Sequence, residues 1–158
     1  MIVLDTGVVY AAYNRRDRHH YDSVALLVHA LEGRWGEPWT TAYVEAEALA
    51  LAKTRLPART VEAIARLFAQ GVVSVWVPRG PEDHQNIRSL FLRYLGIRTL
   101  TLADASLLYL AGGNAVLATF DRSLASLYKG QTVGPGYWSQ LPGEEKARIK
   151  RMIEAEGR

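Results

Sequence analysis

The chain has 158 residues, of which 49% are hydrophobic and 22% are charged, a composition typical of one soluble globular domain. A chain of this length buries a substantial core without help from disulfides or structural zinc. It contains no cysteine, which excludes disulfide scaffolds, thiolate zinc sites, iron–sulfur clusters and cysteine nucleophiles. The 19 basic and 16 acidic residues give a net charge of +3, which favours polyanionic partners only weakly.

Short apolar strands alternate with longer helices along the chain. Residues 2–4 are wholly apolar, as in a strand buried on both faces of a parallel sheet. Further strands are predicted at 39–41, 72–77, 115–119 and 131–133. Helices are predicted at 7–13, 17–31 (with Asp17 as the N-cap), 42–53, 57–70, 82–95, 102–111 and 122–128. This alternation predicts a three-layer α/β/α sandwich with a mostly parallel central sheet.

The end of the compact domain is predicted at a Gly-Pro-Gly turn, residues 134–136. We therefore expect one domain over residues 1–133 and a C-terminal extension over residues 134–158. The extension contains a predicted helix at 141–156, which packs either on its own domain or on a second subunit. Three apolar residues share one face of this helix: Ile149, Met152 and Ile153.

We expect a cytoplasmic protein without a membrane segment. The sequence begins directly with a strand-like run, without the basic start and apolar stretch of a signal peptide. The longest uncharged run, residues 105–120, is too short to span a bilayer and is interrupted at 112–114 by Gly-Gly-Asn.

Two aspartates follow predicted strands. Asp5 comes directly after the first strand, and Asp121 comes shortly after the strand at 115–119. In open α/β sheets, ligands bind outside the carboxyl ends of the strands, where both side chains are expected. An aspartate after a strand is equally often a helix cap, so neither residue alone identifies a site.

Asp104 is harder to explain as a structural residue. It lies in the first turn of its predicted helix, and residues 107, 108 and 111 place it on the apolar face. An unpaired charge buried there costs several kcal/mol, whereas the helix dipole returns up to roughly 1 kcal/mol. We therefore expect a cation beside Asp104.

Two glutamates, Glu45 and Glu47, interrupt the apolar helix at 42–53. Residues two apart on a helix are separated by about 200°, so they cannot share a face. Both have apolar neighbours, and periodicity does not choose between them.

Acids gathered at one sheet edge repel each other and destabilise the fold unless a divalent cation lies among them. Oxygen ligands without cysteine favour magnesium or manganese over zinc. Such ions activate water and stabilise the leaving alkoxide in phosphodiester hydrolysis. If Asp5, Glu47, Asp104 and Asp121 are metal ligands, the other residues carry 19 basic against 12 acidic groups, a charge of +7 that suits a nuclease.

Four short segments stand in a characteristic order: VLDT at 3–6, TAYVEAE at 41–47, LADA at 102–105 and ATFD at 118–121. In this order and spacing, residues 1–133 resemble the PIN-domain ribonucleases of the VapC toxin type. The resemblance implies a metal-dependent endoribonuclease in which Asp5, Glu47, Asp104 and Asp121 bind magnesium or manganese. It selects Glu47, and it implies that Thr119 orients the metal or the water. Glu45 stands where these proteins usually carry an apolar residue, so a site containing Glu45 remains an alternative.

The resemblance also implies partners: an RNA substrate, a second copy in a homodimer, and a small antitoxin protein that fills the acidic groove. Two other functions compete with this interpretation. One is a magnesium-dependent phosphatase with an aspartyl nucleophile, although Gly7 stands where such enzymes need a second aspartate. The other is a non-catalytic PIN-like module that binds RNA or protein.

A histidine-based mechanism has no support in the sequence. The spacing of Asp17, His19 and His20 fits a helix N-cap followed by exposed histidines better than a metal site. His29 and His84 are isolated and are expected at the surface or at the edge of the core, with no acidic partner evident along the chain.

Overall fold

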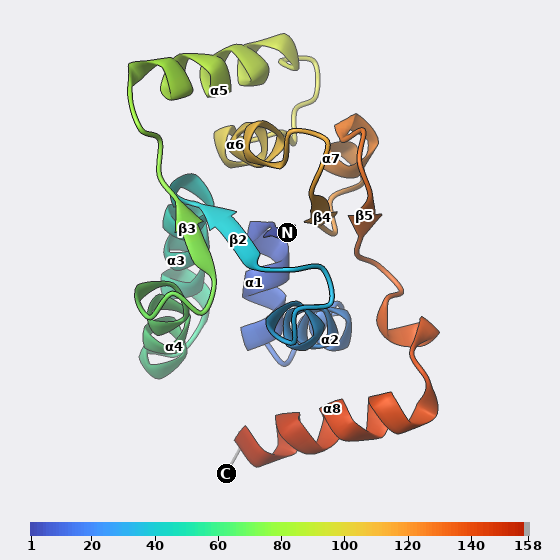
Figure 1. The fold of residues 1–158 in the computed structure, drawn as a ribbon. Coiled ribbons are helices and arrows are strands. Elements are labelled where there is room, and N and C mark those ends of the chain that lie inside the picture. Colours follow the sequence, from blue (N-terminus) through green and yellow to red (C-terminus); the bar gives the residue numbers. More distant parts are fainter. Residues whose placement is uncertain (157–158) are drawn as a thin grey trace.

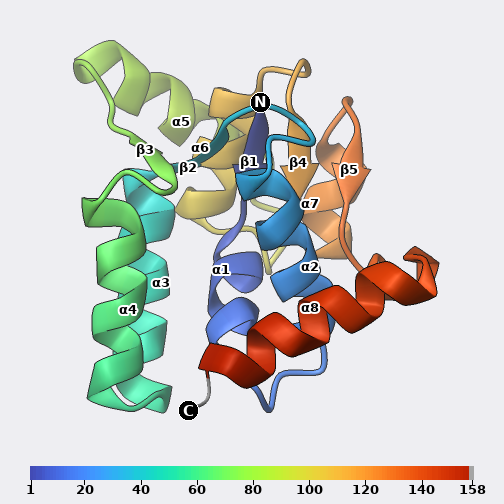
Figure 2. The same ribbon diagram turned by 60° about the horizontal axis from the view of Figure 1, so that its bottom comes forward.

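The fold is organised around its first strand, β1 (Ile2–Leu4), whose three residues are fully buried in a computed structural model that describes residues 1–156. The other strands are β2 (Pro38–Thr41), β3 (Ser74–Trp76), β4 (Val116–Ala118) and β5 (Thr132–Val133). The sheet order is β3-β2-β1-β4-β5, and every neighbouring pair is parallel (Figures 1 and 2). All the carboxyl ends therefore lie at one edge.

Helices cover both faces of the sheet, which confirms the predicted three-layer α/β fold (Figure 1). They are α1 (Thr6–Tyr13), α2 (His20–Leu31), α3 (Ala42–Arg55), α4 (Ala58–Ala69), α5 (Pro81–Arg93), α6 (Leu102–Ala111), α7 (Arg122–Leu127), the 3-10 turn η1 (Trp138–Gln140) and α8 (Gly143–Glu156). No helix in the described part of the chain is long and apolar enough to cross a membrane.

Strand β1 is apolar throughout because both of its faces are covered. Ile2 and Leu4 point into a core cluster formed with residues of α1 to α4, and Val3 points into a second cluster formed with α6 and α7. Alternate residues of a strand face opposite sides of the sheet, so a strand buried on both sides shows no polar alternation.

The predicted elements are present. Strand β3 and helix α2 differ most from their predicted ranges. Strand β3 is shorter than the predicted strand at 72–77. Helix α2 begins at His20 because Asp17 accepts a hydrogen bond from the backbone N–H of His19 (2.8 Å), which holds residues 17–19 in a turn. The prediction that His20 is exposed is wrong: it is buried, and its Nδ1 lies 2.8 Å from the carbonyl oxygen of Ala11.

The C-terminal extension packs against the rest of the same chain. Figure 2 shows α8 lying across α2. Ile149 is fully buried in a small cluster with Ala25 and Leu141, and Ile153 is partly buried against it. Met152 is 42% exposed, so the predicted apolar face is wrong for that residue.

Replacing Ile149 with alanine is expected to destabilise the protein by about 2–4 kcal/mol, because it leaves a cavity between α8 and α2. Urea denaturation followed by circular dichroism measures this loss. The matched control is Met152→Ala on the same helix, which is expected to change stability by less than about 0.5 kcal/mol. Equal stability of the two variants would contradict the packing described here.

Candidate active site

Asp5 leaves the end of β1 and turns toward the neighbouring strand. It is 7% exposed, and its Oδ2 accepts a hydrogen bond from the hydroxyl of Thr119 (2.6 Å). Asp5 occupies the N-cap position of α1, but its side chain makes no capping hydrogen bond. Its carboxylate is therefore directed toward the predicted site and is not used to cap α1.

Thr119 forms hydrogen bonds with both Asp5 and Asp121. Its hydroxyl donates to Asp5 and accepts from the backbone N–H of Asp121 (3.0 Å). Its own backbone carbonyl lies so close to Gly134 that a Cβ at that position would come within 2.0 Å of the oxygen. The glycine after β5 thus allows the close approach that holds Thr119 in place.

Asp121, a candidate site residue, is also a helix cap. Its Oδ1 accepts hydrogen bonds from the backbone N–H groups of Ser123 (2.6 Å) and Leu124 (3.1 Å) at the start of α7. The sequence left open whether Asp5 and Asp121 are helix caps. The structure shows that the side chain of Asp121 caps its helix and that the side chain of Asp5 does not.

Asp104 forms a capping box with Thr101 at the start of α6. The backbone N–H of Thr101 donates to Asp104 Oδ2 (2.7 Å), and the Thr101 hydroxyl accepts from the backbone N–H of Asp104. Asp104 is 6% exposed, as predicted for a residue on the apolar face. The spacing Thr-x-x-Asp at 101–104 indicates such a box, and the sequence analysis missed it.

Glu47 is the glutamate that lies beside Asp5 and Asp104. Its Oε2 accepts a hydrogen bond from the hydroxyl of Thr6 (2.5 Å), the residue that follows Asp5. Glu47 also raises the pKa of Asp5 and of Asp104 through electrostatic repulsion. The geometry therefore favours Glu47 over Glu45.

The acids share one electrostatic environment. Burial raises the pKa of Asp5 to about 7, and repulsion from Asp104 and Glu47 adds to the increase, against the lowering effect of the Thr119 hydrogen bond. Burial also raises the pKa of Asp104, with further repulsion from Glu47 and Asp121. Carboxylates from four separate segments are thus close enough to oppose each other's ionisation.

No basic side chain of residues 1–156 lies within ion-pair distance of Asp104, where a cation was expected. The other three acids likewise form no ion pair with lysine, arginine or histidine in that part of the chain. No three of the four acids bring their ligand atoms within 4.8 Å of one another in the described structure. The four carboxylates are therefore coupled electrostatically but do not form a close ligand cluster.

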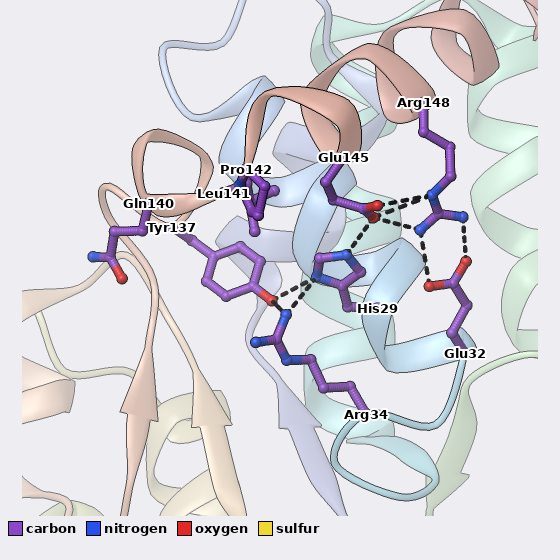
Figure 3. A pocket seen from close by; sticks show the side chains of 9 residues that line it. All are labelled: His29, Glu32, Arg34, Tyr137, Gln140, Leu141, Pro142, Glu145 and Arg148. Carbon is purple, nitrogen blue, oxygen red and sulfur yellow. Dashed lines mark hydrogen bonds and ion pairs between the residues drawn. The ribbon is translucent and has the colours of Figure 1, made fainter.

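A second group of polar and charged side chains joins the C-terminal extension to α2, and we call it the C-terminal clamp. It consists of His29, Glu32, Arg34, Tyr137, Glu145 and Arg148, and it lines a pocket of about 590 Å³ (Figure 3). Arg148 bonds to both carboxylates, with contacts of 2.5 Å to each. Together with His29, it lowers the pKa of Glu145 to about 2.

His29 lies at the centre of this clamp. The prediction that it lacks an acidic partner is wrong: its Nε2 is 2.7 Å from Glu145, which is 116 residues away in sequence. Its Nδ1 is 2.6 Å from the hydroxyl of Tyr137. Such a long separation leaves no local pattern by which the pair could be predicted.

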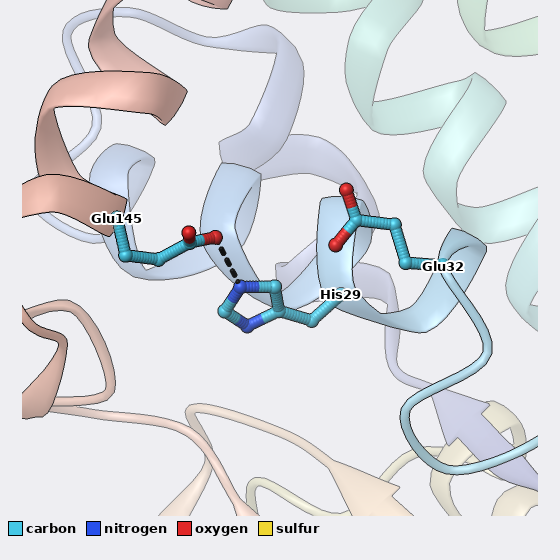
Figure 4. Close-up of side chains that lie close together, drawn as sticks. All are labelled: His29, Glu32 and Glu145. Carbon is cyan, nitrogen blue, oxygen red and sulfur yellow. Dashed lines mark hydrogen bonds and ion pairs between the residues drawn. The ribbon is translucent and has the colours of Figure 1, made fainter.

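Three clamp residues, His29, Glu32 and Glu145, bring possible metal ligands within 4.8 Å of one another (Figure 4). Arg148 already forms ion pairs with both carboxylates, so a metal ion would have to displace a guanidinium group held by several hydrogen bonds. The clamp is therefore better suited to fastening α8 than to binding a metal.

Comparison with known proteins assigns the family. The PIN domain family matches residues 2–130, which include all four acids of the site. The chain belongs to the PIN domain family. A curated relative, the VapC ribonuclease of Archaeoglobus fulgidus, is 29% identical over 157 residues, covering 98% of this chain and 96% of the relative.

Three solved structures share the fold. VapC20 of Mycobacterium tuberculosis, described as a sarcin-ricin loop cleaving toxin, has a TM-score of 0.66 and 21% identity, covering 80% of this chain and 94% of that one. VapBC2 of Rickettsia felis, bound to a promoter DNA fragment, has a TM-score of 0.57 and 13% identity. FitAcB of Neisseria gonorrhoeae has a TM-score of 0.55 and 19% identity. Each of the last two comparisons covers 85% of this chain and 98% of the other.

The raised pKa of Asp5 predicts a pH dependence of stability in metal-free PIN domain protein. Because the folded chain binds this proton more tightly than the unfolded chain, the stabilisation is complete below pH 4 and disappears as the pH rises through about 7. Between pH 5 and pH 8 the wild type should lose about 3 kcal/mol more unfolding free energy than Asp5→Asn. Urea denaturation in EDTA measures this difference, and identical pH dependence of the two proteins would refute it.

Proposed function

We propose that this protein is a metal-dependent endoribonuclease that hydrolyses RNA phosphodiester bonds. The observation that carries the proposal is the convergence of Asp5, Glu47, Asp104 and Asp121, whose mutual repulsion is not relieved by any basic side chain of residues 1–156. The similarity to a VapC ribonuclease over nearly the full chain supports the same activity.

The donor set suits magnesium or manganese. All four candidate ligands are carboxylates, which are hard oxygen donors. Glu47 and Asp121 are each held through a single oxygen, Oε2 and Oδ1, and within residues 1–156 the second oxygen of each accepts no hydrogen bond. Each of these two acids therefore has one oxygen fixed by the fold and one available to an ion.

Neutral groups of the chain hold the carboxylates in place by hydrogen bonds, and no basic side chain of residues 1–156 pairs with them. Thr119 holds Asp5, Thr6 holds Glu47, and the backbone of Thr101 holds Asp104, so three acids are oriented by neutral donors. Neutral donors orient a carboxylate without cancelling its charge, which keeps the site attractive to a divalent cation. When bound, such an ion polarises a phosphoryl oxygen and produces a nucleophilic hydroxide from water at neutral pH.

We infer that the physiological role is that of the toxin of a VapBC-type pair, with a cognate antitoxin as its protein partner. The supporting observations are the VapC name of the curated relative and the toxin description of the VapC20 structure. Assembly as a homodimer is part of the same proposal and rests on family resemblance alone.

Two glutamates on α3 offer a matched test of catalysis. Glu47→Gln is expected to reduce the rate of RNA cleavage at least 100-fold because it removes a charge from the acidic site, whereas Glu45→Gln should retain activity within about threefold. Cleavage of a labelled single-stranded RNA in magnesium or manganese measures both. A folded Glu47→Gln variant with wild-type activity, or loss in Glu45→Gln alone, would contradict the assignment.

Manganese titration by calorimetry separates the acidic site from the clamp. The wild type should bind manganese, Asp104→Asn should bind it at least tenfold more weakly, and Glu145→Gln should bind it as the wild type does. Thermal unfolding confirms that each variant is folded. If Glu145→Gln alone abolishes binding, the metal site is the clamp and the proposed mechanism fails.

A further inference from the structure

A basic pocket lies beyond the acids, on the loop that follows β3. It has a volume of about 510 Å³, and its lining includes Arg79, Gly80, Pro81, His84, Gln85 and Arg88. No residue that lines it is acidic. Arg79 and Arg88 are exposed and permanently charged, and arginine binds phosphate oxygens in a fork geometry.

A neighbouring carboxylate, that of Asp83, is hydrogen-bonded to other groups. It accepts hydrogen bonds from the hydroxyl of Tyr109 (2.7 Å) and from the backbone N–H of Arg79 (2.7 Å). These bonds lower its pKa, so it keeps its charge without occupying the pocket. The guanidinium of Arg79 pairs with no acid in the described part of the chain, and neither does that of Arg88.

The pocket is on the same edge of the sheet as the acids. It follows the carboxyl end of β3, which is parallel to β1 and separated from it by β2 alone (Figure 1). Neighbouring strands are about 4.8 Å apart, so the ends of β1 and β3 are separated by roughly 10 Å across the sheet.

A hydrogen bond links the pocket to the helix that carries Glu47. The hydroxyl of Tyr43 lies 2.5 Å from His84 Nδ1, and the two rings meet edge to face. Tyr43 is four residues before Glu47 on α3, a rise of about 6 Å along the helix. Tyr43 therefore sets the position of His84 relative to the acids.

We propose that this pocket binds a backbone phosphate of single-stranded RNA while a neighbouring phosphodiester lies at the acids. The inference rests on the proposed ribonuclease function and adds to it a binding site for the substrate strand. The acids and the pocket have opposite charges, and both are useful for binding a nucleic acid. A cation held by the acids would contact the phosphate of the bond to be cut. The two arginines would bind a neighbouring phosphate of the same strand.

The test compares two double variants of the full chain. Arg79→Ala/Arg88→Ala removes the pocket charges, and Arg59→Ala/Arg151→Ala removes two exposed arginines from α4 and α8 as a control of equal net charge. Binding of a fluorescein-labelled single-stranded RNA of about twelve nucleotides is measured by anisotropy in EDTA, over a range of sodium chloride concentrations.

The pocket variant is expected to bind the RNA at least tenfold more weakly than wild type. The slope of log affinity against log salt concentration should fall by an amount that corresponds to the loss of about one to two phosphate contacts. The control should lose less than threefold. In magnesium, KM should rise in the pocket variant while kcat stays within about threefold of wild type. Circular dichroism confirms that both variants are folded.

Unchanged binding by the pocket variant, or equal weakening in both variants, would overturn this inference. The outcome is independent of catalysis. If wild-type protein binds the RNA through the pocket but never cuts it with any divalent metal, the proposed ribonuclease function fails and the pocket stands. If the wild type cuts RNA and the pocket variant binds RNA as tightly as the wild type, the ribonuclease function stands and the pocket proposal fails.

Discussion

Electrostatic repulsion among four buried or half-buried carboxylates is the constraint on which the structure of this protein depends. A fold would ordinarily avoid gathering Asp5, Glu47, Asp104 and Asp121 in one place, because repulsion from neighbouring acids raises the pKa of Asp5 and of Asp104. Burial is the largest cause of the raised pKa of Asp5, about 7, and repulsion from Asp104 and Glu47 adds to it. Proteins retain such arrangements where function requires them, and perturbed acids in one region are therefore evidence for a site.

The surrounding fold orients the acids without neutralising them. Threonine hydroxyls and backbone N–H groups hold the carboxylates, and these donors come from the ends of β1 and β4 and the first turns of α6 and α7. The C-terminal clamp differs, because Arg148 forms ion pairs with both Glu32 and Glu145. The clamp acids therefore have a basic partner within the chain, whereas the four acids have no such partner among residues 1–156.

The sequence predicted the layered fold because its strands are short, apolar and separated by helices with clear ends. It also predicted that Asp5 and Asp121 lie at one edge of the sheet, since residues after parallel strands meet there, and it singled out Asp104 by its place on an apolar helix face. It could not choose between Glu45 and Glu47 by periodicity, because both have apolar neighbours on α3. Here the family resemblance selected Glu47, and the Thr6 hydrogen bond agrees. The capping box of Asp104 was visible in the spacing and was overlooked.

Contacts between distant segments were the least predictable. The His29–Glu145 pair joins residues 116 positions apart, and neither residue stands in a pattern that indicates a partner. Residues 17–19 form a turn, so α2 begins at His20, three residues after the predicted N-cap Asp17. In this position His20 is buried against the carbonyl oxygen of Ala11. The basic pocket is formed by the β3–α5 loop and α5, and its His84 contacts Tyr43 of α3, 41 residues away in sequence.

A crystal soaked in manganese, with anomalous diffraction recorded to locate the ion, tests the central claim most directly. The account predicts an anomalous peak bound by carboxylate oxygens of Asp5, Asp104 and at least one of Glu47 and Asp121. A peak only at His29, Glu32 and Glu145, or none near the four acids at saturating manganese, would contradict it.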